Sequence, residues 1–143
     1  MNNPNKVSFL SDGISFDLDN PQIIDEWIQH AIMNEGKSIG DINYVFCSDE
    51  YLYKINLEHL KHNSYTDIIT FDYCFENVIS SDIFISIDRV KDNAHSYNTT
   101  FQNELSRVMI HGVLHLIGYD DKTDSQKEMM RSKEDFYLSL LSI

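Results

Sequence analysis

The chain has 143 residues, of which 42% are hydrophobic and 12% aromatic, and a formal net charge of −12 from 11 basic and 23 acidic side chains. This composition excludes a disordered chain, and the acidic charge argues against a general nucleic-acid binder, because phosphate neutralisation drives non-specific affinity. A local basic patch or a ribosomal partner could still bring such a protein to RNA. We expect one globular domain over residues 1–143.

The sequence contains no visible signal for secretion or membrane insertion. Its first residues are neither basic nor apolar, and no apolar run approaches the roughly twenty residues of a membrane helix. Cys47 and Cys74 lack the CxxC spacing of a thiolate metal site. We therefore expect a cytoplasmic protein with two reduced thiols and no membrane partner.

Strand and helix patterns alternate from the start of the chain. Strands are predicted over residues 7–9 and 14–16, on either side of a turn. Asn20 and Pro21 then predict the N-cap and the first residue of a helix. Apolar residues at helical spacing continue this helix until Gly36.

The same alternation continues through the middle of the chain. A strand over residues 42–47 leads to a helix that Ser48 caps and that reaches Leu60, and strands follow over 68–71 and 83–87. Strands that alternate with helices predict an α/β (α+β) fold, in which helices cover a mixed sheet.

Three further helices are predicted in the last third of the chain. Their caps are side chains that can accept backbone N–H donors: Asp88 for a helix to about Tyr97, Thr99 with Gln102 for residues 100–117, and Thr123 with Gln126 for the last helix. The second half of the 100–117 helix is apolar almost all round, which predicts that it is buried on most sides.

This buried helix carries two histidines, and a glycine and an aspartate follow it. His111 and His115 are four residues apart, so they lie on one helix face. Gly118 ends the helix, and Asp121 can return over the same face. Metzincin metal sites have this ligand spacing, here with aspartate in the third position. The pattern predicts one divalent metal on His111, His115 and Asp121.

Two other interpretations of these residues stay open. Both histidines could be ordinary core residues, but burying two imidazoles costs free energy unless each has a polar partner, and a shared metal supplies both. Asp120 is an equally near carboxylate, so the preference for Asp121 depends on the spacing alone.

The residue after the first histidine bears on the reaction. In the His-Glu-x-x-His proteases this position holds the glutamate that acts as general base. Here it is Gly112, which makes peptide hydrolysis the second choice. Three protein ligands leave one coordination position open, which suits catalysis better than a closed structural site.

Residues 111–121 resemble the signature of the YbeY family of bacterial single-strand-specific endoribonucleases. The family pattern is similar to His-Gly-x-Leu-His-Leu-x-Gly-Tyr-Asp-His, and this chain departs from it only at the last position, Asp121. Residues 65–71, Tyr-Thr-Asp-Ile-Ile-Thr-Phe, resemble the family's Pro-Thr-Asp-Val-Leu-Ser-Phe, and residues 81–83 resemble its Gly-Asp-Ile. The resemblance covers about residues 48–141.

The resemblance implies a zinc-dependent RNase that matures the 3′ end of small-subunit (16S) ribosomal RNA and takes part in ribosome quality control. The implied partners are the ribosomal RNA precursor and the small ribosomal subunit, with no DNA partner. The implied fold packs the two-histidine helix beneath the sheet. His111 and His115 carry over as zinc ligands in the catalytic centre, and Asp121 carries over by position only.

Two departures from the family pattern affect these expectations. Asp121 adds a negative charge, and a set of two histidines and one carboxylate also suits iron(II) or nickel. The family's RNA-contacting arginine has no counterpart, because the sequence has His59-Leu60 at that place. Lys61 or His62 could replace it.

We infer a metal-dependent endoribonuclease, whose nucleophile is open between water and the RNA 2′-hydroxyl. The alternatives are a metalloprotease-like hydrolase and a non-catalytic ribosome-assembly factor with a structural metal. If RNA is the substrate, basic side chains should gather around His111 despite the acidic total. The candidates are Lys54, Lys61, Arg89 and Arg107.

Overall fold

The fold is built on a mixed sheet in the computed structural model, which describes residues 6–59 and 66–141. Its strands within these ranges are β1 (Val7–Ser11), β2 (Ser38–Cys47), β3 (Ile68–Asp72) and β4 (Val78–Ser86). They lie in the order β1-β2-β4-β3. β1, β2 and β4 are parallel, and β3 runs antiparallel to β4 at the edge. The predicted mixed sheet is therefore confirmed.

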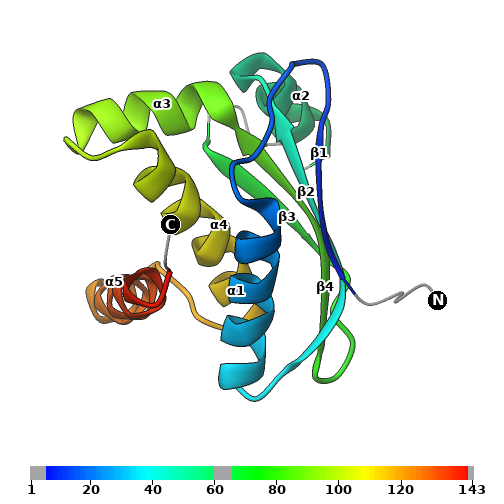
Figure 1. Ribbon diagram of the computed structural model, residues 1–143, viewed down its shortest axis with the longest axis vertical. Helices are drawn as coiled ribbons and strands as arrows, with labels where there is room; N and C mark the ends of the chain where they lie inside the picture. Colours follow the sequence, from blue (N-terminus) through cyan, green and yellow to red (C-terminus); the bar gives the residue numbers. More distant parts are fainter. Residues whose placement is uncertain (1–5, 60–65, 142–143) are drawn as a thin grey trace.

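Helices cover both faces of this sheet. In chain order they are α1 (Pro21–Asn34), α2 (Asp49–His59), α3 (Ile87–Ser96), α4 (Phe101–Ile117) and α5 (Asp124–Ser139). Figure 1 shows α1 and α4 beside one face of the sheet, with α5 on the far side of α4. No helix among the described residues is long and apolar enough to cross a membrane.

The alternation of side chains along β4 explains why both faces are covered. Ile83 and Ile85 point into the main core with α1 and α4. Phe84 points to the other face, where it belongs to a smaller cluster with Leu52 of α2. Successive strand residues face opposite sides, so a sheet with apolar residues at consecutive positions must be buried on both. The prediction that α4 packs against the sheet is confirmed.

Three strand predictions need correction. Residues 14–16 pair with no strand. Phe16 instead packs edge-on against Phe46, 5.0 Å between ring centroids, so its apolar character reflects burial and not sheet pairing. β2 begins at Ser38, before a register shift, and β4 ends at Ser86 and not at 87, because Ile87 starts α3.

Helix caps are partly as predicted. Ser48 and the Thr123–Gln126 pair cap α2 and α5, but the caps of α3 and α4 are neighbouring residues. Ser86 caps α3, and Asp88 instead accepts a hydrogen bond from the Asp49 amide. Thr100 caps α4 in place of Thr99. A sequence with two cap-forming residues within three positions does not reveal which one is used. Asn20 precedes α1 in a left-handed conformation without a side-chain cap bond. Leu60 lies outside the described residues.

Candidate metal centre

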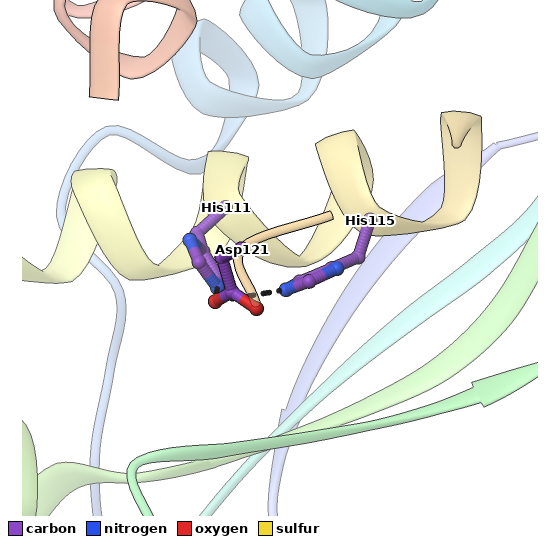
Figure 2. A group of neighbouring side chains, drawn as sticks. All are labelled: His111, His115 and Asp121. Atoms are coloured by element: carbon purple, nitrogen blue, oxygen red, sulfur yellow. Dashed lines mark ion pairs between the residues drawn. The ribbon is translucent and has the colours of Figure 1, made fainter. Parts of the chain in front are cut away.

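The two histidines of α4 project from the same side of the helix toward Asp121 (Figure 2). His111 Nε2 and His115 Nε2 each lie 3.4 Å from Asp121 Oδ2. The two imidazole centroids are 4.6 Å apart. One potential ligand atom from each of the three residues lies within 4.8 Å of the other two. The structure thus brings together the three residues that the sequence singles out.

The separations suit a tetrahedral metal ion. Ligand atoms at about 2.0–2.1 Å from such an ion lie roughly 3.3 Å from each other. The two measured separations of 3.4 Å are close to this value. In the part of the chain that the structure describes, the cluster contains no fourth ligand. The exposed fractions of the side chains, 24% for His111, 30% for His115 and 40% for Asp121, leave the remaining side accessible.

Asp121 reaches the histidines because α4 ends sharply. Gly118 adopts a φ of 129°, which favours glycine, and its amide donates to the carbonyl of Leu114 at 3.1 Å. The next residue, Tyr119, donates its hydroxyl to Glu35 Oε1 at 2.6 Å and so holds the returning loop against the end of α1. Asp120 is exposed and does not join the cluster, whereas Asp121, the carboxylate that the spacing argument prefers, lies beside both histidines.

A buried carboxylate on α5 orients the first histidine. Glu134 Oε2 lies 2.6 Å from His111 Nδ1, and its side chain is only 6% exposed. Arg107 donates from Nη1 to Glu134 Oε1 at 2.8 Å. Because Nδ1 faces a carboxylate, we assign the ring proton to Nδ1, which leaves the Nε2 lone pair toward Asp121. Carboxylate–histidine pairs of this kind are typical of metal-binding histidines.

Sequence reasoning missed Glu134, although a signal was present. The buried stripe of α5 consists of Met130, Glu134 and Tyr137, at helical spacing. A glutamate on the apolar stripe of an amphipathic helix needs a buried partner. That partner lies on another helix and could not be named without the fold.

Burial lowers the pKa of His111, but the hydrogen bond and charge of Glu134, together with the charges of Asp121 and Asp67, raise it more, so the net shift is upward. The same carboxylate that favours a proton on the ring also makes the imidazole a better electron donor to a metal. The environment of His111 is therefore polar and fixes the orientation of its ring, unlike that of an apolar core residue.

Comparison with known proteins shows the family to which the chain belongs. The family model described as endoribonuclease YbeY matches residues 9–142. The chain belongs to the endoribonuclease YbeY family. Its relatives named endoribonuclease YbeY include one from Flavobacterium johnsoniae, 52% identical over 90% of this chain and 92% of the relative. Another, from Christiangramia forsetii, is 49% identical over 96% of both chains.

A solved structure agrees with this family membership at the level of the fold. The solution structure of a Thermotoga maritima protein superimposes with a TM-score of 0.65 and 27% sequence identity, covering 94% of this chain and 88% of that one. The α+β architecture is therefore shared with a protein whose sequence is much less similar than those of the two relatives.

Packing explains why the YbeY-like signature here has glycine after the first histidine. A Cβ atom added to Gly112 would lie 2.8 Å from Ile68 Cδ1 and 3.3 Å from Thr70 Cγ2, both on β3. The helix therefore approaches the edge strand closely at this glycine, and a side chain here would force Ile68 and Thr70 to move. The general-base glutamate of the His-Glu-x-x-His proteases is absent, and placing one here would require these side chains of β3 to shift.

A cavity of about 420 Å³ opens beside the candidate metal centre, between α4, the end of α3 and α5. Its lining includes His111 and Asp121 together with Asp67, from the block that resembles the family's Pro-Thr-Asp. Asp67 accepts a hydrogen bond from Asn93 Nδ2 at 3.3 Å. Burial raises the pKa of Asp67 and also that of Glu104, another carboxylate of the cavity.

The predicted basic residues are distributed differently from the expectation. Arg107 does line the cavity, but its guanidinium contacts Glu134 and Asp135. Arg89 pairs with Asp49 at 2.8 Å and does not line the cavity. Lys54 lies on α2, which covers the opposite face of the sheet from α4.

The candidates for the missing family arginine, Lys61 and His62, lie outside the described residues. The cavity nevertheless has two other basic side chains in its lining, Lys127 and Arg131 of α5, which the sequence did not single out. They entered no motif, and only the folding of α5 against α4 brings them to the cavity.

Proposed function

We propose that this protein is a metal-dependent, single-strand-specific endoribonuclease that acts in the 3′-end maturation of small-subunit (16S) ribosomal RNA and in ribosome quality control. The observation that carries the proposal is the convergence of His111, His115 and Asp121 in a chain of the endoribonuclease YbeY family. The ribosomal RNA precursor, the small ribosomal subunit and a cytoplasmic location are parts of this proposal. The relatives of this chain are named endoribonucleases, which supports RNA as the substrate.

In this proposal His111, His115 and Asp121 hold one divalent ion. Zinc is our first choice because imidazole nitrogens and a carboxylate at tetrahedral separations suit it, and iron(II) or nickel would be held by the same donors. A bound divalent ion would supply Lewis-acid stabilisation of charge on the scissile phosphate and lower the pKa of a coordinated water.

The protein's own residues prepare the centre. Glu134 holds the proton on His111 Nδ1 and fixes the plane of the ring, while Arg107 neutralises the buried carboxylate. The contact between Tyr119 and Glu35 anchors the loop that brings Asp121. These contacts orient the donor atoms in advance, so ordering them costs little free energy when the ion binds.

Two observations favour this function over the alternatives. A metalloprotease of the His-Glu-x-x-His type needs a glutamate where Gly112 packs against β3. A structural metal in an assembly factor would have a closed set of four ligands, whereas this cluster has three partly exposed ligands beside a cavity.

The test joins metal analysis to RNA cleavage. Purified wild-type protein should contain close to one divalent metal per chain and cleave a single-stranded RNA. His115→Ala should lose both the metal and the cleavage. His30→Ala is the matched control, because His30 is exposed on α1, and it should retain both. Full cleavage by His115→Ala would contradict the proposal.

A further inference from the structure

Lys127 and Arg131 lie one turn apart on α5 and line the same cavity as His111 and Asp121. Residues four apart on a helix are neighbours on its surface, with Cβ atoms about 5–6 Å apart. Both side chains are exposed. Neither makes an ion pair or a side-chain hydrogen bond with any residue in the ranges 6–59 and 66–141.

This freedom distinguishes the pair from Arg107, the third cation of the cavity, and from Lys133 on the same helix. Arg107 and Lys133 are engaged with carboxylates of the protein itself. In a chain with 23 acidic against 11 basic residues, a cation has many available partners. Two adjacent cations that form no ion pair within these ranges, at the edge of the candidate metal centre, are available to bind an external anion.

The charges that line the cavity also favour the binding of an anion. Four carboxylates line it: Asp67, Glu104, Asp121 and Glu134. Three cations, Arg107, Lys127 and Arg131, oppose them. The formal charge is therefore −1 with neutral histidine, and a divalent ion would bring it to +1. A metal-loaded cavity in this acidic protein would then carry a local positive charge that attracts an anion.

An aromatic ring stands at the same cavity. Tyr97, which follows α3, lines the cavity and is 66% exposed. Exposed aromatic rings beside basic side chains are the elements with which proteins bind single-stranded nucleic acid, because an unpaired base can stack on the ring while the cations bind phosphates. A base inside a duplex is not available for this stacking.

We propose that Lys127 and Arg131 bind backbone phosphates of single-stranded RNA beside the metal centre, with Tyr97 stacking on an unpaired base. This inference depends on the proposed function for the identity of the nucleic acid. It assigns to α5 the phosphate contacts for which the sequence offered Lys54, Lys61, Arg89 and Arg107.

The test compares two charge-reversed proteins with the wild type, all loaded with a divalent metal. The first is K127E/R131E. The second is K6E/K37E, which changes the net charge by the same amount but alters the exposed Lys6 and the partly exposed Lys37, just before β1 and β2 and away from the cavity lining. Binding of a fluorescent 2′-O-methyl single-stranded oligonucleotide is measured by anisotropy at several salt concentrations.

We expect K127E/R131E to weaken binding about tenfold or more and to reduce the slope of log affinity against log salt by about 1.4, or about 0.7 for each lost phosphate contact. K6E/K37E should bind like the wild type. Metal affinity should be the same in all three proteins. K127Q/R131Q is a second variant, which keeps the test valid if charge reversal disturbs α5. Y97A should weaken single-strand binding, whereas Y97F should not.

Equal weakening by both charge-reversed proteins, or none by either, would overturn the inference. The same experiments distinguish a failure of the proposed function from a failure of the phosphate site. If the wild type binds the oligonucleotide through Lys127 and Arg131 but never cleaves RNA, the phosphate site stands and the nuclease does not. If RNA is cleaved with an unchanged KM in K127E/R131E, the nuclease stands and the phosphate site does not. A wild type that binds no oligonucleotide overturns the inference as well.

Discussion

Glu134 Oε2 lies 2.6 Å from His111 Nδ1, although the two residues are 23 positions apart and belong to different helices. The contact joins α5 to the candidate metal centre on α4. It also gives a buried carboxylate two partners, since Arg107 occupies its other oxygen. A buried charge without partners would be costly, so Glu134, Arg107 and His111 depend on one another.

The first prediction concerns metal affinity. Replacing Glu134 with alanine should weaken metal binding by about 10–100-fold, because His111 loses the group that fixes its tautomer and orientation. Glu134→Gln should have a smaller effect, since the amide oxygen can still accept a hydrogen bond but carries no charge. Titration of the metal against a competing chelator measures both. Glu128→Ala, an exposed position of α5, is the control, and equal affinities in all four proteins would contradict the role of Glu134.

This contact also shows what the sequence can and cannot predict. His111, His115 and Asp121 are predictable because a helix and one glycine turn bring them together within eleven residues, so local geometry is sufficient. Glu134 depends on how α5 packs against α4, which no local rule determines. The same limit explains Lys127 and Arg131, whose function depends on their position beside a distant helix.

The elements of the fold also fall into those that the sequence predicts and those that it does not. Strands and helices with strong periodicity were predictable, and so was the helix-covered mixed sheet. The segment at 14–16 was mistaken for a strand because Phe16 is apolar for another reason, its packing on Phe46. The start of β2 at Ser38 was missed because the strand passes through an irregular register near Gly40, which weakens the alternating pattern.

A second prediction concerns Gly112. Gly112→Ala should lower the free energy of unfolding, because the overlap of the new methyl group with Ile68 on β3 should cost roughly 1–3 kcal/mol. This loss should exceed the gain of about 1 kcal/mol that alanine normally brings to a helix. Denaturant titration gives the value, and Ser132→Ala on the exposed side of α5 is the control that should show no loss. An alanine variant as stable as the wild type would show that β3 yields to the added group.

The third prediction concerns acid stability. Burial raises the pKa of Glu35, but hydrogen bonds from Tyr119, Tyr137 and Lys133 lower it more, and the net shift is downward. A lowered pKa in the folded state means that ionised Glu35 stabilises the fold above the pKa of the unfolded chain, and that this stabilisation is lost as the pH falls. Glu35→Gln should therefore have a lower Tm than the wild type at neutral pH.

The difference in Tm between the two proteins should shrink below about pH 4, because Glu35 of the wild type then takes up a proton and, like glutamine, carries no charge. Thermal unfolding at a series of pH values measures it. Glu58→Gln, at an exposed position of α2, should follow the wild type at every pH. A difference between wild type and Glu35→Gln that is constant with pH would mean that the ionisation of Glu35 does not contribute.

The last prediction separates a catalytic metal from a structural one. Val108, Val113 and Leu114 of α4 are buried in the main core, and their packing needs no metal. Glu134 holds His111, and the contact between Glu35 and Tyr119 holds the loop of Asp121. A domain of this length also buries enough surface to fold unaided. Removal of the metal should therefore leave the helical circular-dichroism signal unchanged while cleavage of single-stranded RNA is lost.

Adding back zinc should restore cleavage in the wild type but not in His115→Ala, which distinguishes loss of the ion from damage by the chelator. Zinc fingers behave in the opposite way, because they unfold when the metal leaves. A collapse of the helical signal on chelation would favour the assembly factor with a structural metal. Cleavage that continues after complete metal removal would exclude a metal-dependent mechanism, even though His111, His115 and Asp121 converge in the fold.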